Sequence, residues 1–427
     1  MSPRLSLFRR CFHRAASLTE SGEVGVSELV KRTRNPIREL VDRMGVKPNP
    51  KKEVIPLSIG DPTVFGNFTP PSHVFDELKR IYETGRYNGY AHSSGYQEVR
   101  SCIARRFSPP SPSPQLTAND VVLTSGCSQA LDYCFSVLFE PGTDSVLLPR
   151  PGFPLYQTMC ESKGIHFSHY NLLPEKEWEI DLEDLDRQLQ SQPNVKAVLI
   201  NNPSNPTGSV FSKEHLQDLL FLLEKRGKVL ISDEIYADMG FPGVSFHSAS
   251  SLSENVPILS VGGLAKQFMI PGWRVGWVIV HDRQNTMGGV RNGLGTVATI
   301  NLGPCSLAQA LVPSLLEKTP ADYFEDVKIR LEEHARVVCG GIEKIEGLTA
   351  VRPRGAMYVM VRVDPSVLKF EDDEEFGRRL LEEESVFVLP GACFQYKGFF
   401  RIVTTPPIGM LEEAVNRIAA FCSRHRL

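Results

Sequence analysis

A single lysine stands in an apolar stretch of the sequence, "SVGGLAKQFMIPGWRVGW" (residues 260–277), and an arginine follows eight positions later between two tryptophans. By ordinary burial preferences Lys266 and Arg274 would each be surface charges, because these residue types are seldom buried without a partner. In an apolar setting, however, a lysine amine can attack a carbonyl group, and an arginine can bind phosphate. Their function depends on which other side chains the fold brings to them.

A second candidate group lies in "TSGCSQALDYCF", where an apolar run ends in Ser125, Gly126 and Cys127 and a helical pattern begins near Ser128. Small residues let the backbone approach an anion closely, and the first amides of a helix are free to bind it. These residues would form a phosphate-binding site. The alternative is an ordinary helix cap, for which serine is equally suited.

Two further apolar runs end in polar side chains. "ISDEIY" places Asp233 at the end of a hydrophobic run, with Tyr236 three residues later. A carboxylate in that position costs free energy unless a positive group meets it. "INNPSNPTG" holds Asn205 among three asparagines and two prolines, which is either a turn cluster or a source of amide donors.

The elements that must position these residues are short strands that alternate with helices. The apolar runs are "DVVLTSG", "DSVLLPRP", "KAVLINNP", "KVLISDE" and "VPILSVG". Near-continuous runs of this kind are typical of strands buried on both faces of a parallel sheet, with helices such as "HLQDLLFLLEKRG" as crossovers. Ligands bind beyond the carboxyl ends of such strands. The predicted fold class is α/β, with a mostly parallel sheet flanked by helices in a large domain.

The C-terminal part of the chain predicts a smaller α+β domain. A long charged helix is followed by "GAMYVMVRV", a helix around "EEFGRRLLEEE", then "VFVLPG", "FFRIVTT" and a final helix. The predicted organisation is a basic arm or targeting segment (1–20), an N-terminal part of the small domain (21–60), a large cofactor-binding domain (61–320) and a C-terminal small domain (321–427).

The basic arm leaves the cellular location open. The first nineteen residues contain four arginines, three serines and no acidic residue. That composition is typical of a mitochondrial transit peptide and equally of a basic tail on a cytoplasmic protein.

Composition limits the classes of partner. The chain of 427 residues is 41% hydrophobic and 23% charged with a net charge of −3, which gives no reason to expect nucleic acid or a membrane surface as partner. No apolar run approaches the roughly 18 residues of a membrane-spanning helix. The nine cysteines lack metal-ligand spacing, so we expect reduced thiols and no metal site. Small molecules are the expected partners.

The candidate residues together match one ligand, pyridoxal 5'-phosphate. Its aldehyde requires a lysine for a Schiff base, its ring nitrogen requires an acidic partner, and its phosphate suits a helix start with an arginine. Lys266, Asp233 and Arg274 supply these groups together with the Ser125 turn.

Longer motifs extend this match to a protein family. The motifs run from Asn35 in "NPIREL" to the C-terminus in the order "LSIGDPTVFGNF", "YNGYAHSSGY", "NNPSNPTGSVFSKEHL", "DEIYADM" and "GGLAKQFMIPGWRVGW". The sequence resembles the fold type I pyridoxal-phosphate aminotransferases, and among them those that accept tyrosine.

The resemblance implies a role for each candidate residue. Lys266 would bind the cofactor and then act as the base that moves a proton between substrate and cofactor. Asp233 would keep the ring nitrogen protonated. Tyr236 and Asn205 would bind the ring hydroxyl, Phe153 would lie on the ring face, and Tyr156 would lie beside the ring. The phosphate would be bound by Arg274 and by the amides of Ser125, Gly126 and Cys127.

The resemblance also implies contacts with the substrate and with a second subunit. Arg401 in "FFRIVTT" would grip the substrate α-carboxylate, for which the two-pronged guanidinium is suited; the alternative is a salt bridge at a strand edge. Gly60 in "SIGDP" would lie beside the substrate, and Tyr156 and Asn205 would contact it. Tyr90 in "YNGYAHSSG" would reach the phosphate of the neighbouring subunit, which implies a homodimer.

One motif departs from the family pattern. Many relatives have a serine immediately before the cofactor lysine or three residues before it, whereas Ala265 and Gly263 stand there in this chain. Whether Ser260 substitutes as a phosphate donor is left open.

The implied activity is transfer of the amino group of L-tyrosine to 2-oxoglutarate through a ping-pong mechanism, which gives 4-hydroxyphenylpyruvate and glutamate. Alternatives on the same fold are an aminotransferase of broad aromatic, alanine or kynurenine type and a carbon–sulfur lyase. The fold also serves cofactor-bound transcriptional regulators, but no helix-turn-helix pattern precedes "NPIREL".

Overall fold

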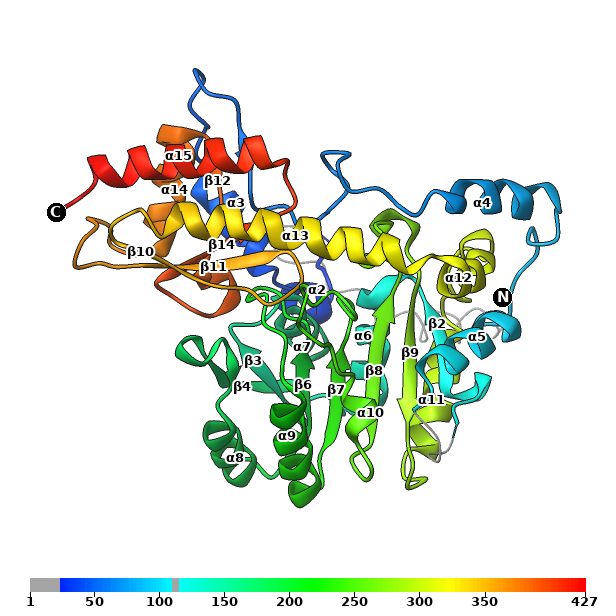
Figure 1. Ribbon diagram of the computed structural model, residues 1–427. Helices are drawn as coiled ribbons and strands as arrows, with labels where there is room; N and C mark the ends of the chain where they lie inside the picture. Colours follow the sequence, from blue (N-terminus) through cyan, green and yellow to red (C-terminus); the bar gives the residue numbers. More distant parts are fainter. Residues whose placement is uncertain (1–23, 110–114) are drawn as a thin grey trace, which may run out of the picture.

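The computed structural model describes residues 24–109 and 115–427 (Figure 1). The predicted basic arm at 1–20 therefore lies outside the described residues. In the described part of the chain, no helix combines the length and the apolar character needed to cross a membrane.

The central element is an eight-stranded sheet, and it confirms the predicted fold class. Its strands stand in the order β2 (Val121–Thr124), β9 (Gly276–His281), β8 (Ile258–Gly263), β7 (Val229–Asp233), β6 (Val195–Asn201), β3 (Ser145–Arg150), β4 (His166–Leu173) and β5 (Glu179–Ile180). The pairs from β8 through β7, β6 and β3 to β4 are parallel. β9 is antiparallel to both of its neighbours, and β5 is antiparallel to β4. All five predicted strands are present, whereas β4, β5 and β9 were not predicted.

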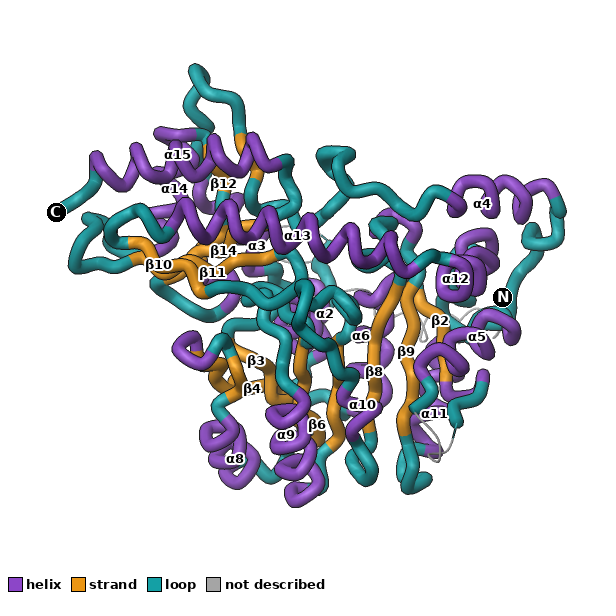
Figure 2. The backbone as a smooth tube through the Cα atoms, viewed as in Figure 1, coloured by secondary structure: helices purple, strands orange, loops and turns teal. Residues whose placement is uncertain are grey.

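Helices cover both faces of this sheet, as Figure 2 shows in purple against the orange strands. Ala197 and Leu199 of β6 pack in a cluster with α6 (Gly126–Leu138) and α7 (Leu155–Lys163). Val198 and Ile200, which point the other way, pack in a cluster with α8 (Leu182–Ser191) and α9 (Lys213–Arg226). Because alternate side chains of one strand are buried on opposite faces, the strand reads as a continuous apolar run.

The remaining helices of this part complete the cover. They are α4 (His73–Glu83), α5 (Gln97–Phe107), α10 (Ala249–Leu252), α11 (Gly288–Ala298) and α12 (Ser306–Lys318). Side chains of α4, α5 and α12 form a cluster with β2 and β9.

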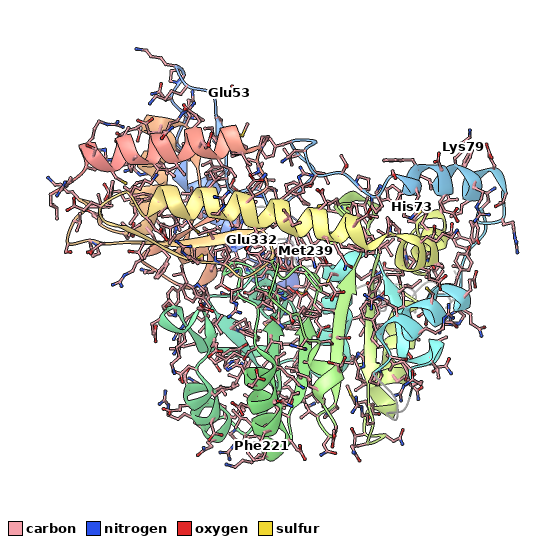
Figure 3. All side chains as sticks on the ribbon, in the orientation of Figure 1. Glu53, His73, Lys79, Phe221, Met239 and Glu332 are labelled. Atoms are coloured by element: carbon pink, nitrogen blue, oxygen red, sulfur yellow. The ribbon has the colours of Figure 1, made fainter. Side chains whose placement is uncertain are left out.

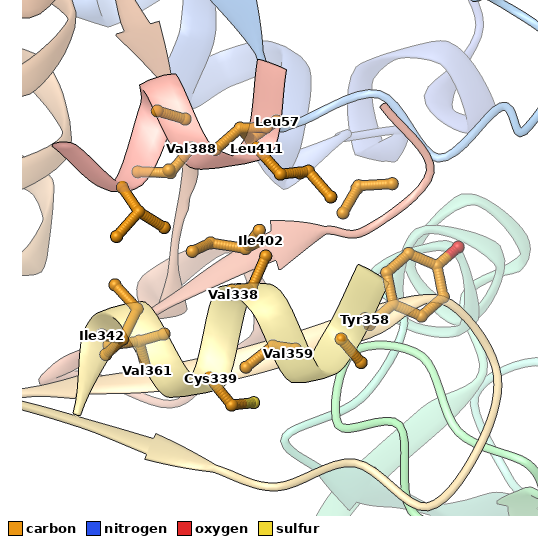
Figure 4. Packing of buried hydrophobic residues seen from close by; sticks show 14 of the residues in the cluster. Leu57, Val338, Cys339, Ile342, Tyr358, Val359, Val361, Val388, Ile402 and Leu411 are labelled. Carbon is orange, nitrogen blue, oxygen red and sulfur yellow. The ribbon is translucent and has the colours of Figure 1, made fainter. Parts of the chain in front are cut away.

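A second, antiparallel sheet follows near the C-terminus. Its order is β10 (Leu348–Val351), β11 (Tyr358–Val363), β14 (Phe399–Val403) and β13 (Leu389–Pro390). It packs with α13 (Ala321–Ile342), α14 (Asp373–Glu384) and α15 (Ile408–Arg424) around one apolar cluster, in which Val338 and Ile342 of α13 lie beside Val359 and Val361 of β11 (Figure 4). The helix and strand patterns predicted for this region are confirmed.

The N-terminal segment contacts both parts of the molecule. α2 (Glu28–Arg32) lies on α7, and α3 (Pro36–Met44) lies on the short helix η4 (Gly391–Phe394). β1 (Ile55–Pro56) pairs in parallel with β12 (Val386–Phe387). The domain boundaries proposed from the sequence stay a prediction.

The two sheets meet at the carboxyl edge of the large sheet. The backbone carbonyl of Met239, in the loop after β7, accepts a hydrogen bond of 3.0 Å from the amide of Ala356 just before β11. Figure 3 places Met239 at this junction. Loops after the parallel strands are therefore brought against the strands of the second sheet.

Candidate active site

A pocket of about 430 Å³ lies at this junction of the two sheets. Ten of the residues predicted from the sequence line it: Gly60, Cys127, Phe153, Tyr156, Asn205, Asp233, Tyr236, Lys266, Arg274 and Arg401. They come from seven separate stretches of the chain, so the fold and not a single motif brings them together.

Lys266 lies in the loop after β8, and its Nζ donates to the carbonyl oxygen of Gly60 over 2.5 Å. Burial lowers the pKa of this amine from 10.5 to about 8. Asp61 opposes the shift, whereas the positive charges of Arg401 and Arg274 add to it. An amine with this pKa is partly neutral near pH 8, which is the form that attacks a carbonyl group or accepts a proton.

Asp233 ends β7 and is 3% exposed. Its Oδ2 accepts a hydrogen bond of 2.7 Å from the hydroxyl of Tyr156, and its Oδ1 accepts from the amide of Ile235 at 3.1 Å and from the thiol of Cys127 at 3.6 Å. Burial raises the pKa of the carboxyl group, and these donors lower it. Among the described residues Asp233 has no ion-pair partner, so the positive group expected from the sequence is not a side chain of this part of the chain.

The start of α6 faces Arg274. The guanidinium donates to the carbonyl oxygen of Ser125 at 3.3 Å, and a Cβ on Gly126 would lie 2.4 Å from Nη2 of Arg274. Gly126 also has a φ of +76°, which only glycine adopts at little cost. The glycine is therefore what allows the arginine to approach the helix start.

The amides at this helix start are not equivalent. The amide of Ser125 already donates to Oε1 of Gln129 at 2.7 Å. The first amides of the helix proper have no acceptor within the helix, and Cys127 and Ser128 line the pocket whereas Ser125 and Gly126 do not. Of the predicted Ser125–Gly126–Cys127 turn, Cys127 lines the pocket, and Ser128 lies beside it.

Arg401 lies in β14 and is 3% exposed. Its Nη1 donates to Oδ1 of Asn205 and its Nη2 to the carbonyl oxygen of Ser58, each at 2.8 Å. Its Nε is buried and has no hydrogen-bond partner. Among the described residues Arg401 has no salt bridge at a strand edge, and its Nε–H and one N–H on each of Nη1 and Nη2 remain for a ligand.

Three predicted residues do not line the pocket: Tyr90, Ser125 and Gly126. Tyr90 is 93% exposed and does not line the pocket. Ser260 is buried, and its hydroxyl shares a hydrogen bond of 2.8 Å with Nε2 of His281. Ser260 is not among the residues that line the pocket.

Several pocket residues were not predicted from the sequence. The polar ones are Ser58, Ser128, Asn201 and Tyr358, and the apolar ones include Ile37, Ile59, Leu155, Phe387 and Leu389. Asn201 was in a quoted motif, and its position at the end of β6 could have marked it. Tyr358 and the apolar residues carry no such signal, because they reach the pocket only through the packing of the second sheet and the N-terminal segment.

The residues fit pyridoxal phosphate. Asp233, a buried carboxylate with no cationic partner among the described residues, suits a protonated ring nitrogen. The free amides at the start of α6, together with Arg274, suit a phosphate. Phe153 lies at the pocket wall with its ring perpendicular to that of Tyr156, 5.7 Å between centroids. In the part of the chain that is described, no three His, Cys, Asp or Glu side chains are grouped so that they could hold a metal ion.

The α/β fold and this set of residues define a class of enzyme that acts through an active-site lysine. The family model for aminotransferase class I and II matches residues 52–418, and the chain belongs to this family. Aminotransferases of this class and fold generally depend on pyridoxal phosphate.

Within this family the chain is similar to tyrosine aminotransferases. The chain is 47% identical to tyrosine aminotransferase of Mus musculus, over 93% of this chain and 87% of the relative, and 46% identical to that of Homo sapiens over the same shares. The crystal structure of tyrosine aminotransferase from Leishmania infantum superposes with a TM-score of 0.90 at 36% identity, covering 95% of this chain and 99% of that one.

Proposed function

We propose that this protein transfers the amino group of L-tyrosine to 2-oxoglutarate, with pyridoxal 5'-phosphate as cofactor, and gives 4-hydroxyphenylpyruvate and glutamate. The observation that carries the proposal is that one pocket combines an apolar wall with a buried arginine, Arg401, whose Nε has no hydrogen-bond partner. Similarity to tyrosine aminotransferases over most of the chain supports the same substrate.

The pocket residues would hold the cofactor as follows. Lys266 would bind it covalently, Asp233 would face the ring nitrogen, and Phe153 would lie against the ring. Tyr236 and the free amide group of Asn205 would bind the ring hydroxyl, and Arg274 with the amides of α6 would bind the phosphate. When bound, the cofactor supplies an electron sink for the carbanion formed at the substrate α-carbon.

Lys266 would move the proton at the α-carbon. Its pKa of about 8 makes the amine a competent base near neutral pH, because a base works best when its pKa lies close to the working pH. The hydrogen bond to the carbonyl oxygen of Gly60 fixes the amine on the pocket side where the substrate would lie.

Arg401 would bind the α-carboxylate that both substrates share. The side chain of the amino donor would then lie against Ile37, Ile59, Leu155, Phe387 and Leu389, which line the pocket. Burying an aromatic side chain against such a wall stabilises the complex by roughly 1.5–3 kcal/mol. An aromatic donor is favoured for this reason.

The second carboxylate of 2-oxoglutarate has no dedicated partner among the lining residues of the described chain, where the cationic side chains are Lys266, Arg274 and Arg401. A mobile loop or a polar side chain would have to meet it. Since hydrophobic contacts separate similar donors by only about 1–3 kcal/mol, we expect phenylalanine, tryptophan, methionine or alanine to react more slowly than tyrosine but measurably.

Tyr90 and the oligomeric state belong to the same proposal. Tyr90 is exposed and does not line the pocket of its own chain, so its proposed contact with the cofactor phosphate would be made in a neighbouring subunit and the protein would act as a homodimer. Light scattering at the assay concentration tests this, and an active monomer would contradict it. Residues 61–320 would form the large domain, and 21–60 with 321–427 the small one.

The test of substrate is a ranking of specificity constants for amino acids at fixed 2-oxoglutarate. We expect tyrosine to lead. If alanine or aspartate exceeds it by more than about tenfold, roughly 1.4 kcal/mol in the barrier, the assignment to tyrosine is wrong although the family stands. Formation of the keto acid only when an amino acceptor is added distinguishes a transaminase from a lyase.

A further inference from the structure

Tyr358, at the start of β11, connects two groups of the pocket that no hydrogen bond joins directly. Its side chain is 2% exposed, and its hydroxyl lies 2.5 Å from the hydroxyl of Tyr236. Its ring lies beneath the guanidinium of Arg401, with 4.7 Å from Cζ to the ring centroid. Gly60 leaves room for it, since a Cβ there would lie 3.1 Å from the Tyr358 hydroxyl.

We propose that Tyr358 is a positioning residue with two separable functions: its hydroxyl directs the proton of Tyr236 toward the cofactor, and its ring fixes the guanidinium of Arg401 for the substrate carboxylate. This inference rests on the proposed function for the roles of Tyr236 and Arg401, and goes beyond it by assigning a residue that no motif marked.

The first function follows from counting donors. Each phenol carries one proton, and burial raises the pKa of both, so both are neutral at ordinary pH. If Tyr236 gives its proton to the ring oxygen of the cofactor, only Tyr358 can be the donor between the two phenols. A phenol that accepts a hydrogen bond is a stronger donor in turn, because hydrogen bonds in a chain polarise one another.

The second function follows from the surroundings of Arg401. The ring of Phe394 lies on the guanidinium as well, 4.9 Å from centroid to Cζ. Hydrogen bonds to Asn205 and Ser58 hold Nη1 and Nη2, so the two rings and these acceptors restrict the plane of the group. A carboxylate must then approach the guanidinium at its edge, where two parallel hydrogen bonds can form.

Two substitutions separate these functions. Tyr358→Phe removes the hydroxyl and keeps the ring, and Tyr358→Leu removes both. Tyr170→Phe is the matched control, because Tyr170 is also fully buried, with its hydroxyl bonded at 2.8 Å to the carbonyl oxygen of Leu199, and it does not line the pocket. Thermal unfolding of the cofactor-free proteins verifies that each variant folds.

The readout for the hydroxyl is the pH midpoint of the visible absorbance of the cofactor-loaded protein, which requires no turnover. A hydrogen-bond donor at the ring oxygen stabilises the deprotonated form of the bound cofactor. A weaker donor therefore raises the pH midpoint of the absorbance change. We expect Tyr358→Phe to raise it by roughly 0.5–1 pH unit and to lower kcat about 3–10-fold with KM unchanged. The control should not move the midpoint.

The readout for the ring is KM. Tyr358→Leu should raise KM for tyrosine and for 2-oxoglutarate together by about 5–30-fold, because the α-carboxylate is common to both. An unchanged midpoint in Tyr358→Phe, or an unchanged KM in Tyr358→Leu, would overturn the corresponding function. If the wild type transaminates another donor, the KM comparison is made with that donor. If it transaminates none, the proposed function fails while the absorbance result still decides the first function.

Discussion

The hydroxyl of Tyr156 donates a hydrogen bond of 2.7 Å to Oδ2 of Asp233, and both side chains are almost completely buried, with exposures of 1% and 3%. The resemblance placed Tyr156 beside the ring and in contact with substrate, whereas the structure shows its hydroxyl on the carboxylate. This bond matters because burial alone would favour the neutral acid, and only an ionised Asp233 can pair with a protonated ring nitrogen.

Removing that hydroxyl should shift the acid limb of activity. Tyr156→Phe deletes a donor that lowers the pKa of Asp233, so the pKa rises further and protonation begins at higher pH. We expect the acid limb of the pH profile of kcat/KM to move upward by roughly 0.5–1 unit and kcat at neutral pH to fall several-fold. An acid limb that stays in place, as it should in Tyr170→Phe, would contradict this role.

Lys266 should be indispensable for turnover but not for holding the cofactor. The wild-type protein should be yellow, and Lys266→Ala should bind the cofactor reversibly without transamination, because the phosphate and ring contacts remain. Dialysis followed by absorbance measures the release. Wild-type rates in the variant would refute the mechanism.

The lowered pKa of Lys266 also predicts a pH dependence of stability. Without cofactor, the folded state holds fewer protons on this amine than the unfolded state between pH of about 8 and 10.5. Stability contributed by this group therefore rises with pH through that window and is lower below it. In Lys266→Met the unfolding free energy of the cofactor-free protein should change less between pH 8 and pH 10 than in the wild type. Urea unfolding at the two pH values measures this. Identical slopes in both proteins would count against the shift.

Gly126→Ala should weaken cofactor binding through the phosphate. The added Cβ would lie 2.4 Å from Nη2 of Arg274 at a φ of +76°, so the arginine must move away from the helix start. Gly142→Ala is a matched control, with a φ of +73° and nothing within 4 Å of its added Cβ. Both variants bear the backbone strain, about 1 kcal/mol, but only Gly126→Ala should raise the dissociation constant of pyridoxal phosphate, by about tenfold or more. Equal affinities in the two variants would show that Arg274 does not need this glycine.

Asp373 should stabilise the segment that carries Phe394, whose ring lies on the guanidinium of Arg401. Its carboxylate is 2% exposed and accepts from the amides of Ala392 at 2.8 Å and Gly398 at 3.0 Å, which fixes the loop that carries Phe394. Asp373→Ala leaves two buried donors unsatisfied and should lower the unfolding free energy by about 2–4 kcal/mol. Glu412→Ala, on the exposed side of α15, should change it by less than about 0.5 kcal/mol. A loss no larger than that of the control would show that the loop does not depend on Asp373.

The sequence predicted what depends on local pattern. The five apolar runs are strands, and their polar ends converge because the carboxyl ends of parallel strands share one edge. β9 was missed because its first two residues, Gly276 and Trp277, belong to the motif that was interpreted as a cofactor site, so the apolar run that continues to His281 was not considered as a strand. Tyr358 could not be found from the sequence, since its two contacts, Tyr236 in the loop after β7 and Arg401 in β14, are far from it along the chain.

The fate of nitrogen tests the central claim most directly. Protein loaded with cofactor is incubated with ¹⁵N-tyrosine and unlabelled 2-oxoglutarate, and ¹⁵N is measured in glutamate and in free ammonium. We predict that labelled glutamate forms in equal amount to 4-hydroxyphenylpyruvate, and that Lys266→Ala forms neither. Label released as ammonium, or keto acid formed without labelled glutamate, would contradict the assignment of this protein as a tyrosine-directed aminotransferase.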